Sequence, residues 1–284
     1  MSLILAILAQ VGPFATTPPP EPLRPPPRAA APAATPAPPS AAAPPPAARS
    51  RLEFCLDSAQ SAPVDAIDDA ETWRDAVQGS ARAEPDLCLG TANARLEHWS
   101  EAEDAFLAGR DAAVESDRQL RAKLGGMAGN AALAQGAFER ALPQLDMALA
   151  DARAANDARL TGELQIDRAR ALVALKRPGE AEAALAEART VASDNSLAWL
   201  LSATLSRRQS QLAAAQEQIA KAAELAPRDP EVGLEAGVIA MLAGNEAAAR
   251  KSWQSAIDMA PDSEAAATAK GYLAQLGTPA QSKP

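Results

Sequence analysis

The 284-residue chain is poor in the side chains that most catalytic and metal sites use. It has one histidine, His98, and only two cysteines. It contains no Cys-x-x-Cys pair, no GxGxxG stretch, no P-loop and no GxSxG turn. A lone histidine next to a turn is more often solvated than catalytic. We therefore predict that the chain is not an enzyme and that it binds no cofactor and no metal ion.

The chain also lacks an excess of positive charge, long hydrophobic runs and aromatic residues. Its 27 Lys and Arg against 36 Asp and Glu give a formal net charge of −9, which disfavours nucleic acid as a partner. The apolar run near the N-terminus is too short for a stable membrane span. Aromatics make up only 3% of the chain, so its core must consist of small and aliphatic side chains.

Proline, by contrast, is abundant at one end. Of the 24 prolines, 15 lie in the first fifty residues, in runs such as PPPEPLRPPPR. Such a segment supports neither a helix nor a sheet and has almost nothing to bury. We predict that residues 16–50 form a disordered, Pro/Ala-rich linker.

The first fifteen residues, MSLILAILAQVGPFA, resemble the apolar region of a secretory signal that ends near Ala15. No Lys or Arg precedes the apolar run, so a misassigned start or a merely apolar terminus stays open as an alternative. Export predicts a periplasmic or extracellular protein in which Cys55 and Cys88 form a disulfide. A cytoplasmic protein would keep both thiols reduced.

A stripe of small, large and small residues with helical spacing recurs five times. The copies are Ala102-Phe106-Gly109, Ala141-Leu145-Ala148, Ala181-Leu185-Ala188, Ala215-Ile219-Ala222 and Ala249-Trp253-Ala256. Another small residue stands twelve places before each leading alanine: Gly90, Gly129, Ala169, Ala203 and Gly237. Such self-similarity at spacings of 34 to 40 residues indicates a repeat architecture.

The stretch GNAALAQGAFERALPQLDMAL, together with these five copies, resembles the tetratricopeptide repeat family. The resemblance implies an all-α fold, a right-handed α-solenoid of stacked antiparallel helix pairs, over residues 51–277. We expect a degenerate unit at 51–80, units at 83–116, 122–155, 162–195, 196–229 and 230–263, a closing helix at 263–276 and a tail at 278–284. In such a stack Cys55 and Cys88 would lie on neighbouring first helices.

Three departures from the family pattern give expectations of their own. The longer spacings require insertions near residues 115–121 and 154–161. Pro143 falls inside a predicted second helix, which it should bend or delay. Gly125 and Gly126 have no packing reason to be small, so alanine at either position should stabilise the helix.

By resemblance, the first helices line a concave groove that binds a peptide or a partner protein. The positions that would face it include Asn130, Arg170, Thr204, Arg207, Val238 and Met241. Arg170 either grips the ligand or pairs with an acidic neighbour in the solenoid. We predict a protein-binding scaffold in the periplasm or cell envelope, or alternatively a cytosolic regulatory or chaperone-like adaptor. The pattern does not indicate an oligomeric state.

Overall fold

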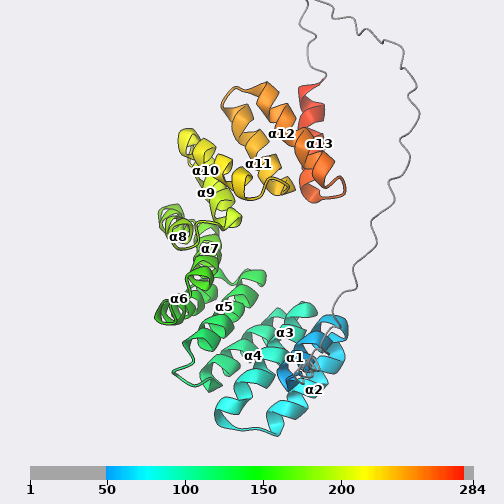
Figure 1. Ribbon diagram of the computed structural model, residues 1–284, viewed down its shortest axis with the longest axis vertical. Helices are drawn as coiled ribbons and strands as arrows, with labels where there is room; N and C mark the ends of the chain where they lie inside the picture. The colour runs from blue at the N-terminus through cyan, green and yellow to red at the C-terminus, as the bar shows by residue number, and fades with distance from the viewer. Residues whose placement is uncertain (1–48, 278–284) are drawn as a thin grey trace, which may run out of the picture. The chain divides into compact units, whose positions relative to one another are not determined.

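The computed structural model describes residues 49–277, in which all regular structure is helical apart from one short 3₁₀ turn, η1 (Gly79–Arg82). The helices of this part of the chain are α1 (Arg51–Ser61), α2 (Pro63–Asp75), α3 (Ala83–Arg95), α4 (Trp99–Ala112), α5 (Arg118–Ala134), α6 (Phe138–Ala154), α7 (Ala158–Ala174), α8 (Pro178–Val191), α9 (Ser196–Arg208), α10 (Leu212–Leu225), α11 (Pro230–Leu242), α12 (Glu246–Met259) and α13 (Glu264–Leu276). They stack in chain order as antiparallel pairs, closed by α13 (Figure 1). The fold is an α-solenoid of tetratricopeptide type.

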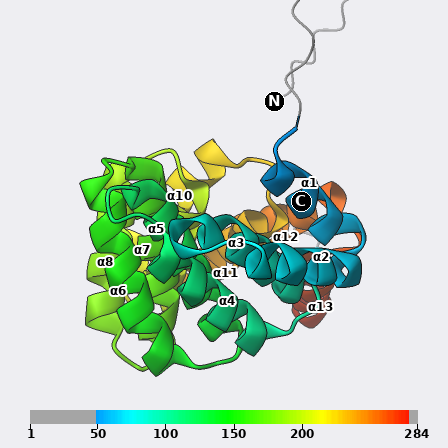
Figure 2. The same cartoon turned by 90° about the horizontal axis from the view of Figure 1, so that it is seen from below.

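The first helices of successive pairs form one layer. α5 contacts α7, α7 contacts α9, α9 contacts α11, and α11 contacts α13. Figure 2 shows α5 and α7 on the inner side of α6 and α8. We call the surface formed by the first helices the inner face, and it is the face that the family resemblance assigns to ligand binding.

Small and large residues interlock within each pair. A Cβ atom added to Gly129 of α5 would lie 2.7 Å from Cγ of Leu145 of α6. A Cβ added to Gly237 of α11 would lie 2.2 Å from Nε1 of Trp253 of α12. These overlaps mean that the small residue of the first helix lets the large residue of the second helix fill the crossing. The recurring pattern in the sequence is therefore a packing pattern.

The turn inside each pair also repeats. In the five pairs from α3–α4 to α11–α12, this turn contains one residue with a positive φ angle: Glu97, Gly136, Lys176, Ser210 and Gly244. Only two of the five are glycine, the residue that adopts this conformation without steric cost. The turn thus keeps the same backbone conformation at the three positions where the residue is not glycine.

The inserted residues of the longer repeats lengthen helices. α5 begins at Arg118 and α7 at Ala158, four residues before the units drawn at 122–155 and 162–195. Asp117 and Asp157 cap these helices by accepting hydrogen bonds from the backbone N–H groups of Leu120 and Leu160. Each insertion therefore supplies an N-cap and an extra turn to a first helix.

Pro143 does not delay the start of its helix, which was one of the two effects expected of it. α6 begins at Phe138 and continues past Pro143 to Ala154. The proline lies near the start of the helix, where backbone N–H groups lack an intrahelical acceptor or have only just gained one. Losing one such donor costs less there than in the middle of the helix.

The premise that Gly125 and Gly126 have no packing reason to be small was wrong. A Cβ atom on Gly125 would lie 3.2 Å from Ala148 Cβ and 3.2 Å from Arg110 Cδ, and one on Gly126 would lie 2.6 Å from Leu164 Cδ2. Both glycines are buried where α5 meets neighbouring helices. The sequence pattern does not reveal these contacts.

Replacing Gly126 with alanine is therefore expected to destabilise the protein by about 1 kcal/mol. Crowding the buried Leu164 costs about 1–3 kcal/mol, and the better helix propensity of alanine offsets about 1 kcal/mol of this. Gly271→Ala in α13 is the matched control, since its added Cβ meets no atom within 4 Å. It should stabilise by about 1 kcal/mol. Urea unfolding measures both changes, and a stabilised Gly126→Ala protein would contradict the packing described here.

The predicted signal segment 1–15, most of the predicted disordered linker 16–50 and the tail 278–284 lie outside the described residues. Within residues 49–277, no helix combines the length and apolar character that crossing a bilayer requires.

Candidate functional site

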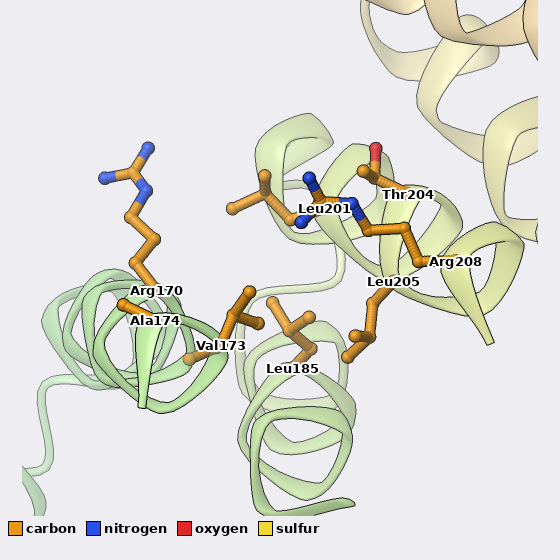
Figure 3. A pocket seen from close by; sticks show the side chains of 9 residues that line it. Arg170, Val173, Ala174, Leu185, Leu201, Thr204, Leu205 and Arg208 are labelled. Carbon is orange, nitrogen blue, oxygen red and sulfur yellow. The ribbon is translucent and has the colours of Figure 1, made fainter. Parts of the chain in front are cut away.

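A pocket of about 240 Å³ opens between α7, α8 and α9. Its walls are mostly apolar, and we call it the α7–α9 pocket. It is lined by Ala169, Arg170, Val173, Ala174, Leu185, Leu201, Thr204, Leu205 and Arg208. Figure 3 shows Val173, Leu185 and Leu205 converging at its base, with the two arginines at its rim. The pocket can accept one large apolar side chain and presents positive charge beside it.

Helical spacing explains which residues line this pocket. Leu201, Thr204 and Arg208 follow one another at intervals of three and four along α9 and so share one face. Along α7, Val173 and Ala174 stand three and four residues after Arg170 and so lie on the same face as Arg170. Because Ala169 and Ala174 are small, α7 leaves space opposite the leucines of α9.

The two arginines of the rim differ in their surroundings. Arg170 Nη1 donates to Asp167 Oδ1 at 2.8 Å, while 49% of the Arg170 side chain stays exposed. Thus the ion pair with an acidic neighbour, one of the two roles foreseen for Arg170, is present. Arg208 is exposed and forms no ion pair with any residue of the 49–277 range. Its guanidinium reaches over the pocket toward Leu201 (Figure 3).

Asp167 connects two of the predicted groove residues. Burial raises the pKa of its carboxyl, and hydrogen bonding to Asn130 and the charge of Arg170 only partly offset this effect. Asn130 stands on α5 and Arg170 on α7, so Asp167 ties neighbouring repeats together on the inner face. Asn130 is exposed but does not line the α7–α9 pocket.

A second pocket, of about 270 Å³, continues from the first along the inner face. It is lined by Leu200, Leu201, Thr204, Glu231, Leu234, Glu235, Glu264, Ala265 and Thr268, which come from α9, α11 and α13. We call it the α9–α13 pocket. It shares Leu201 and Thr204 with the first pocket, but its charged residues are glutamates.

Arg207 does not line either pocket, contrary to our expectation. Its guanidinium donates to both carboxylate oxygens of Glu235, from Nε at 2.6 Å and from Nη2 at 3.1 Å. Glu235 is buried, so this two-bond pair joins α9 to α11. Arg207 therefore has a structural contact in the place of the ligand contact that we predicted.

Of the other predicted groove residues, Thr204 lines the two pockets, and Val238 and Met241 do not. Thr204 is in both, and its hydroxyl donates to the Leu200 carbonyl at 3.1 Å. Val238 is half-buried against the cluster around Trp253. Met241, 36% exposed, and Leu242, 58% exposed, stand at the end of α11 and line neither pocket. The structure thus brings together Arg170 and Thr204 and separates them from Val238 and Met241.

Leu201 is one of the pocket residues that our sequence reasoning missed. It does not stand at any of the positions that the family resemblance assigns to the groove. Its spacing of three before Thr204 was the available signal, since the two positions share a helix face.

The lone histidine and the buried carboxylates of residues 49–277 have the following surroundings. His98 is exposed at the start of α4. No group of three or more His, Cys, Asp or Glu side chains in this range is placed to hold a metal ion. The strongly buried carboxylates have arginine or amide partners, as a helical scaffold requires.

Cys55 of α1 and Cys88 of α3 form a disulfide pair in the structure, with their Cα atoms 6.0 Å apart. That separation is usual for a disulfide. Both residues are buried in a cluster with Trp73 and Leu89. The bond ties the first helix of the solenoid to the first helix of the next pair.

Comparison with solved structures finds similar folds at low sequence identity. BtubC of P. vanneervenii is 16% identical, with a TM-score of 0.59 over 83% of this chain and 98% of its own. The apo form of RapI is 13% identical, with a TM-score of 0.59 over 78% and 94%. PilF of Pseudomonas aeruginosa is 12% identical, with a TM-score of 0.56 over 78% and 99%. The likeness is to the fold.

The sequence comparisons add no relative. The chain matches no protein-family model, and no curated protein matches it. The two inner-face pockets therefore provide the main indication of function.

Proposed function

We propose that this chain is a non-catalytic scaffold that holds an extended segment of a partner protein on its inner face, anchored in the α7–α9 pocket. The pocket itself carries the proposal. It combines an apolar base with an arginine, Arg208, that has no acidic partner within the described range. Clefts with an apolar lining and a few charged groups at the rim are typical of ligand sites.

The chemistry of the pocket specifies the anchor of the partner segment. A leucine-sized side chain would contact Val173, Leu185 and Leu205. A carboxylate close to it in the chain would meet the guanidinium of Arg208, whose planar fork can donate two parallel hydrogen bonds. The proposed ligand therefore has a large apolar residue with an acid one or two residues away.

We place this scaffold in the periplasm or cell envelope, with the same fold in a cytosolic adaptor as the alternative. The buried pair Cys55–Cys88 supports the first reading, since disulfides persist in oxidising compartments. N-terminal analysis of the native protein distinguishes the two. A chain that begins near Thr16 and has no free thiol indicates export, and a chain that begins at Met1 with two free thiols indicates the cytosol.

Arg208→Ala is expected to weaken binding of the partner by about tenfold, because a charge-assisted hydrogen bond contributes roughly 1.5–3 kcal/mol. The partner is first identified by placing a photo-reactive side chain at Thr204 in living cells and analysing the crosslinks. Isothermal titration then gives the Kd. Arg170→Ala should have a smaller effect, since Arg170 already pairs with Asp167.

Two controls accompany this measurement. Circular dichroism should show an unchanged helix content in both variants, since both side chains are exposed. Raising the salt concentration should increase the Kd of the wild-type complex, so that it approaches the Kd of the Arg208→Ala complex. If Arg208→Ala binds the partner with the affinity of wild type, the ligand has no carboxylate that forms an ion pair with Arg208.

A further inference from the structure

The two pockets of the inner face differ in charge. Arg170 and Arg208 stand at the rim of the α7–α9 pocket, whereas every charged residue that lines the α9–α13 pocket is a glutamate. The pockets share Leu201 and Thr204 in their lining, so they adjoin one another on α9. A ligand anchored in the first pocket therefore reaches the second with the neighbouring part of its chain.

The glutamates of the second pocket differ in their partners. Glu235 is buried, and both of its carboxylate oxygens accept hydrogen bonds from Arg207, which balances its charge. Glu231 and Glu264 are exposed and form no ion pair with another described residue. The pocket therefore carries negative charge that no side chain of residues 49–277 balances.

Helix stability alone does not explain where these two acids lie. Both Glu231 and Glu264 stand in the first turn of a helix, where a negative charge is favourable. Glu101 of α4 and Glu139 of α6 do the same, but they belong to second helices and line neither inner-face pocket. Glu231 and Glu264 come from different helices and line one pocket together with the apolar side chain of Leu234.

The lining of the α9–α13 pocket specifies the kind of cation it can take. Within residues 49–277 no three His, Cys, Asp or Glu side chains are placed to hold a metal ion, and this includes the three glutamates here. Leu201 and Leu234 provide apolar surface in the same pocket, whose volume is about 270 Å³. A Lys or Arg side chain fits this combination, because its aliphatic stem packs on apolar surface while its charged head stays in contact with water and carboxylates.

The distance between the two pockets determines the spacing of the ligand residues. Neighbouring helices of one layer pack about 8–10 Å apart, and the second pocket lies on the other side of α9 from the first. An extended chain rises about 3.3 Å per residue, so three residues span roughly 10 Å. A ligand with a large apolar residue in the first pocket therefore reaches the second pocket about three residues further along.

We propose that the α9–α13 pocket binds a Lys or Arg side chain of the partner segment that the α7–α9 pocket anchors. The base stands about three residues from the apolar anchor, on the side opposite to the acid that meets Arg208. The inference rests on the proposed function, because both pockets hold one ligand. The partner segment thus carries an acid, a large apolar residue and a base in this order along the inner face, and the opposite charges fix the direction in which it crosses α9.

Selection from a library of short random peptides, with the immobilised full chain as the target, tests this inference. We expect the enriched peptides to carry a Lys or Arg about three residues from a large apolar residue. Glu231→Gln together with Glu264→Gln should remove the preference for the base and keep the preference for the acid and the apolar residue. Glu101→Gln together with Glu139→Gln is the matched control. It removes the same charge from a chain of net charge −9 but leaves the pocket unchanged, so the preference for the base should persist.

The Kd of one enriched peptide, measured by isothermal titration, gives the size of the effect. The protein with glutamine at positions 231 and 264 should bind this peptide about tenfold more weakly than wild type, and the control protein should bind it like wild type. A peptide whose base is replaced by methionine should bind wild type about tenfold more weakly as well. It should lose no further affinity for the protein with the two glutamines, because the same contact is already absent.

Two results would overturn the inference. One is a set of enriched peptides with no preference for a base. The other is a preference that both pairs of substitutions reduce equally, because the base would then respond only to the net charge of the chain. The proposed function fails on different results. If the enriched peptides bind Arg208→Ala and Leu201→Asp with wild-type affinity, or if no peptide is enriched, both proposals are wrong. If Arg208→Ala removes a preference for the acid while no base is selected, the proposed function stands and only the second pocket is wrongly assigned.

Discussion

Replacing Asp151 with alanine is expected to lower the free energy of unfolding by about 3–5 kcal/mol. Asp151 lies on α6 with only 5% of its side chain exposed. Its carboxylate accepts hydrogen bonds from Arg110 Nη2 at 2.8 Å and Arg118 Nη1 at 2.9 Å, and Arg121 Nε lies 3.8 Å away. Removing this carboxylate leaves the buried Arg110 without its main counter-charge, and such an unpaired buried charge is strongly destabilising.

The same carboxylate predicts a pH dependence. Burial alone would raise the pKa of Asp151, but hydrogen bonds from Arg118 and Arg110 and the nearby positive charges outweigh it and lower the pKa. A lowered pKa in the folded state means that the ionised group stabilises the fold above its unfolded pKa of about 3.9. This contribution disappears as the pH falls through the folded pKa, so the difference between wild type and Asp151→Ala should shrink in acid.

Asp146→Ala is the matched control for this prediction. Asp146 also lies on α6 and pairs with Arg168 at 2.7 Å, but its side chain is exposed. An exposed ion pair contributes roughly 0–1 kcal/mol, so this variant should unfold almost like wild type. Urea denaturation from pH 3 to pH 7 measures both. Equal losses for the two variants would show that Asp151 is not a buried junction between repeats.

Reducing the bond between Cys55 and Cys88 is expected to lower the free energy of unfolding by about 4 kcal/mol, or less if the reduced chain retains structure. The bond closes a loop with a sequence separation of 33 and restricts the unfolded chain. It also holds α1 against α3 in the first helix pair of the described solenoid, where α1 contacts α2 and α3. Hydrogen exchange in α1 and α2 should accelerate most.

A Cys55→Ala, Cys88→Ala double variant provides the control, because its unfolding should not respond to reductant. Its stability should lie near that of the reduced wild type, since alanine fills most of each small buried site. Urea unfolding with and without reductant measures the difference. If oxidised protein with a verified bond unfolds at the same urea concentration as reduced protein, the bond does not constrain the fold.

Sequence periodicity was sufficient to predict the architecture. One helix crossing is formed by Gly237 on one side and the stripe Ala249-Trp253-Ala256 on the other. The recurrence of this pattern along the chain predicts the stack. Such a pattern works because each repeat contacts only its neighbours, so local spacing determines most of the packing.

The roles that the sequence predicted incorrectly belong to residues whose contacts are made between repeats. Gly126 is small because Leu164 of the following repeat lies against it. Arg207 likewise forms an ion pair with Glu235 of the following repeat. Neither partner stands at a fixed spacing within one repeat, so the repeat pattern carries no signal for them. The α7–α9 pocket likewise arises from the fit between two neighbouring repeats, and only the structure reveals that Leu201 and Arg208 share it with Arg170.

The central claim, that the inner face at α9 binds the partner, is tested most directly by the Kd of the identified partner for two matched variants. Leu201→Asp puts a carboxylate into the lining of both pockets, and Met147→Asp makes the same kind of change on an exposed apolar residue of α6. We predict that Leu201→Asp weakens binding by about tenfold or more, as expected for a central apolar contact, while Met147→Asp binds like wild type. The reverse result, with binding lost in Met147→Asp and kept in Leu201→Asp, would place the partner on the second helices and contradict the account.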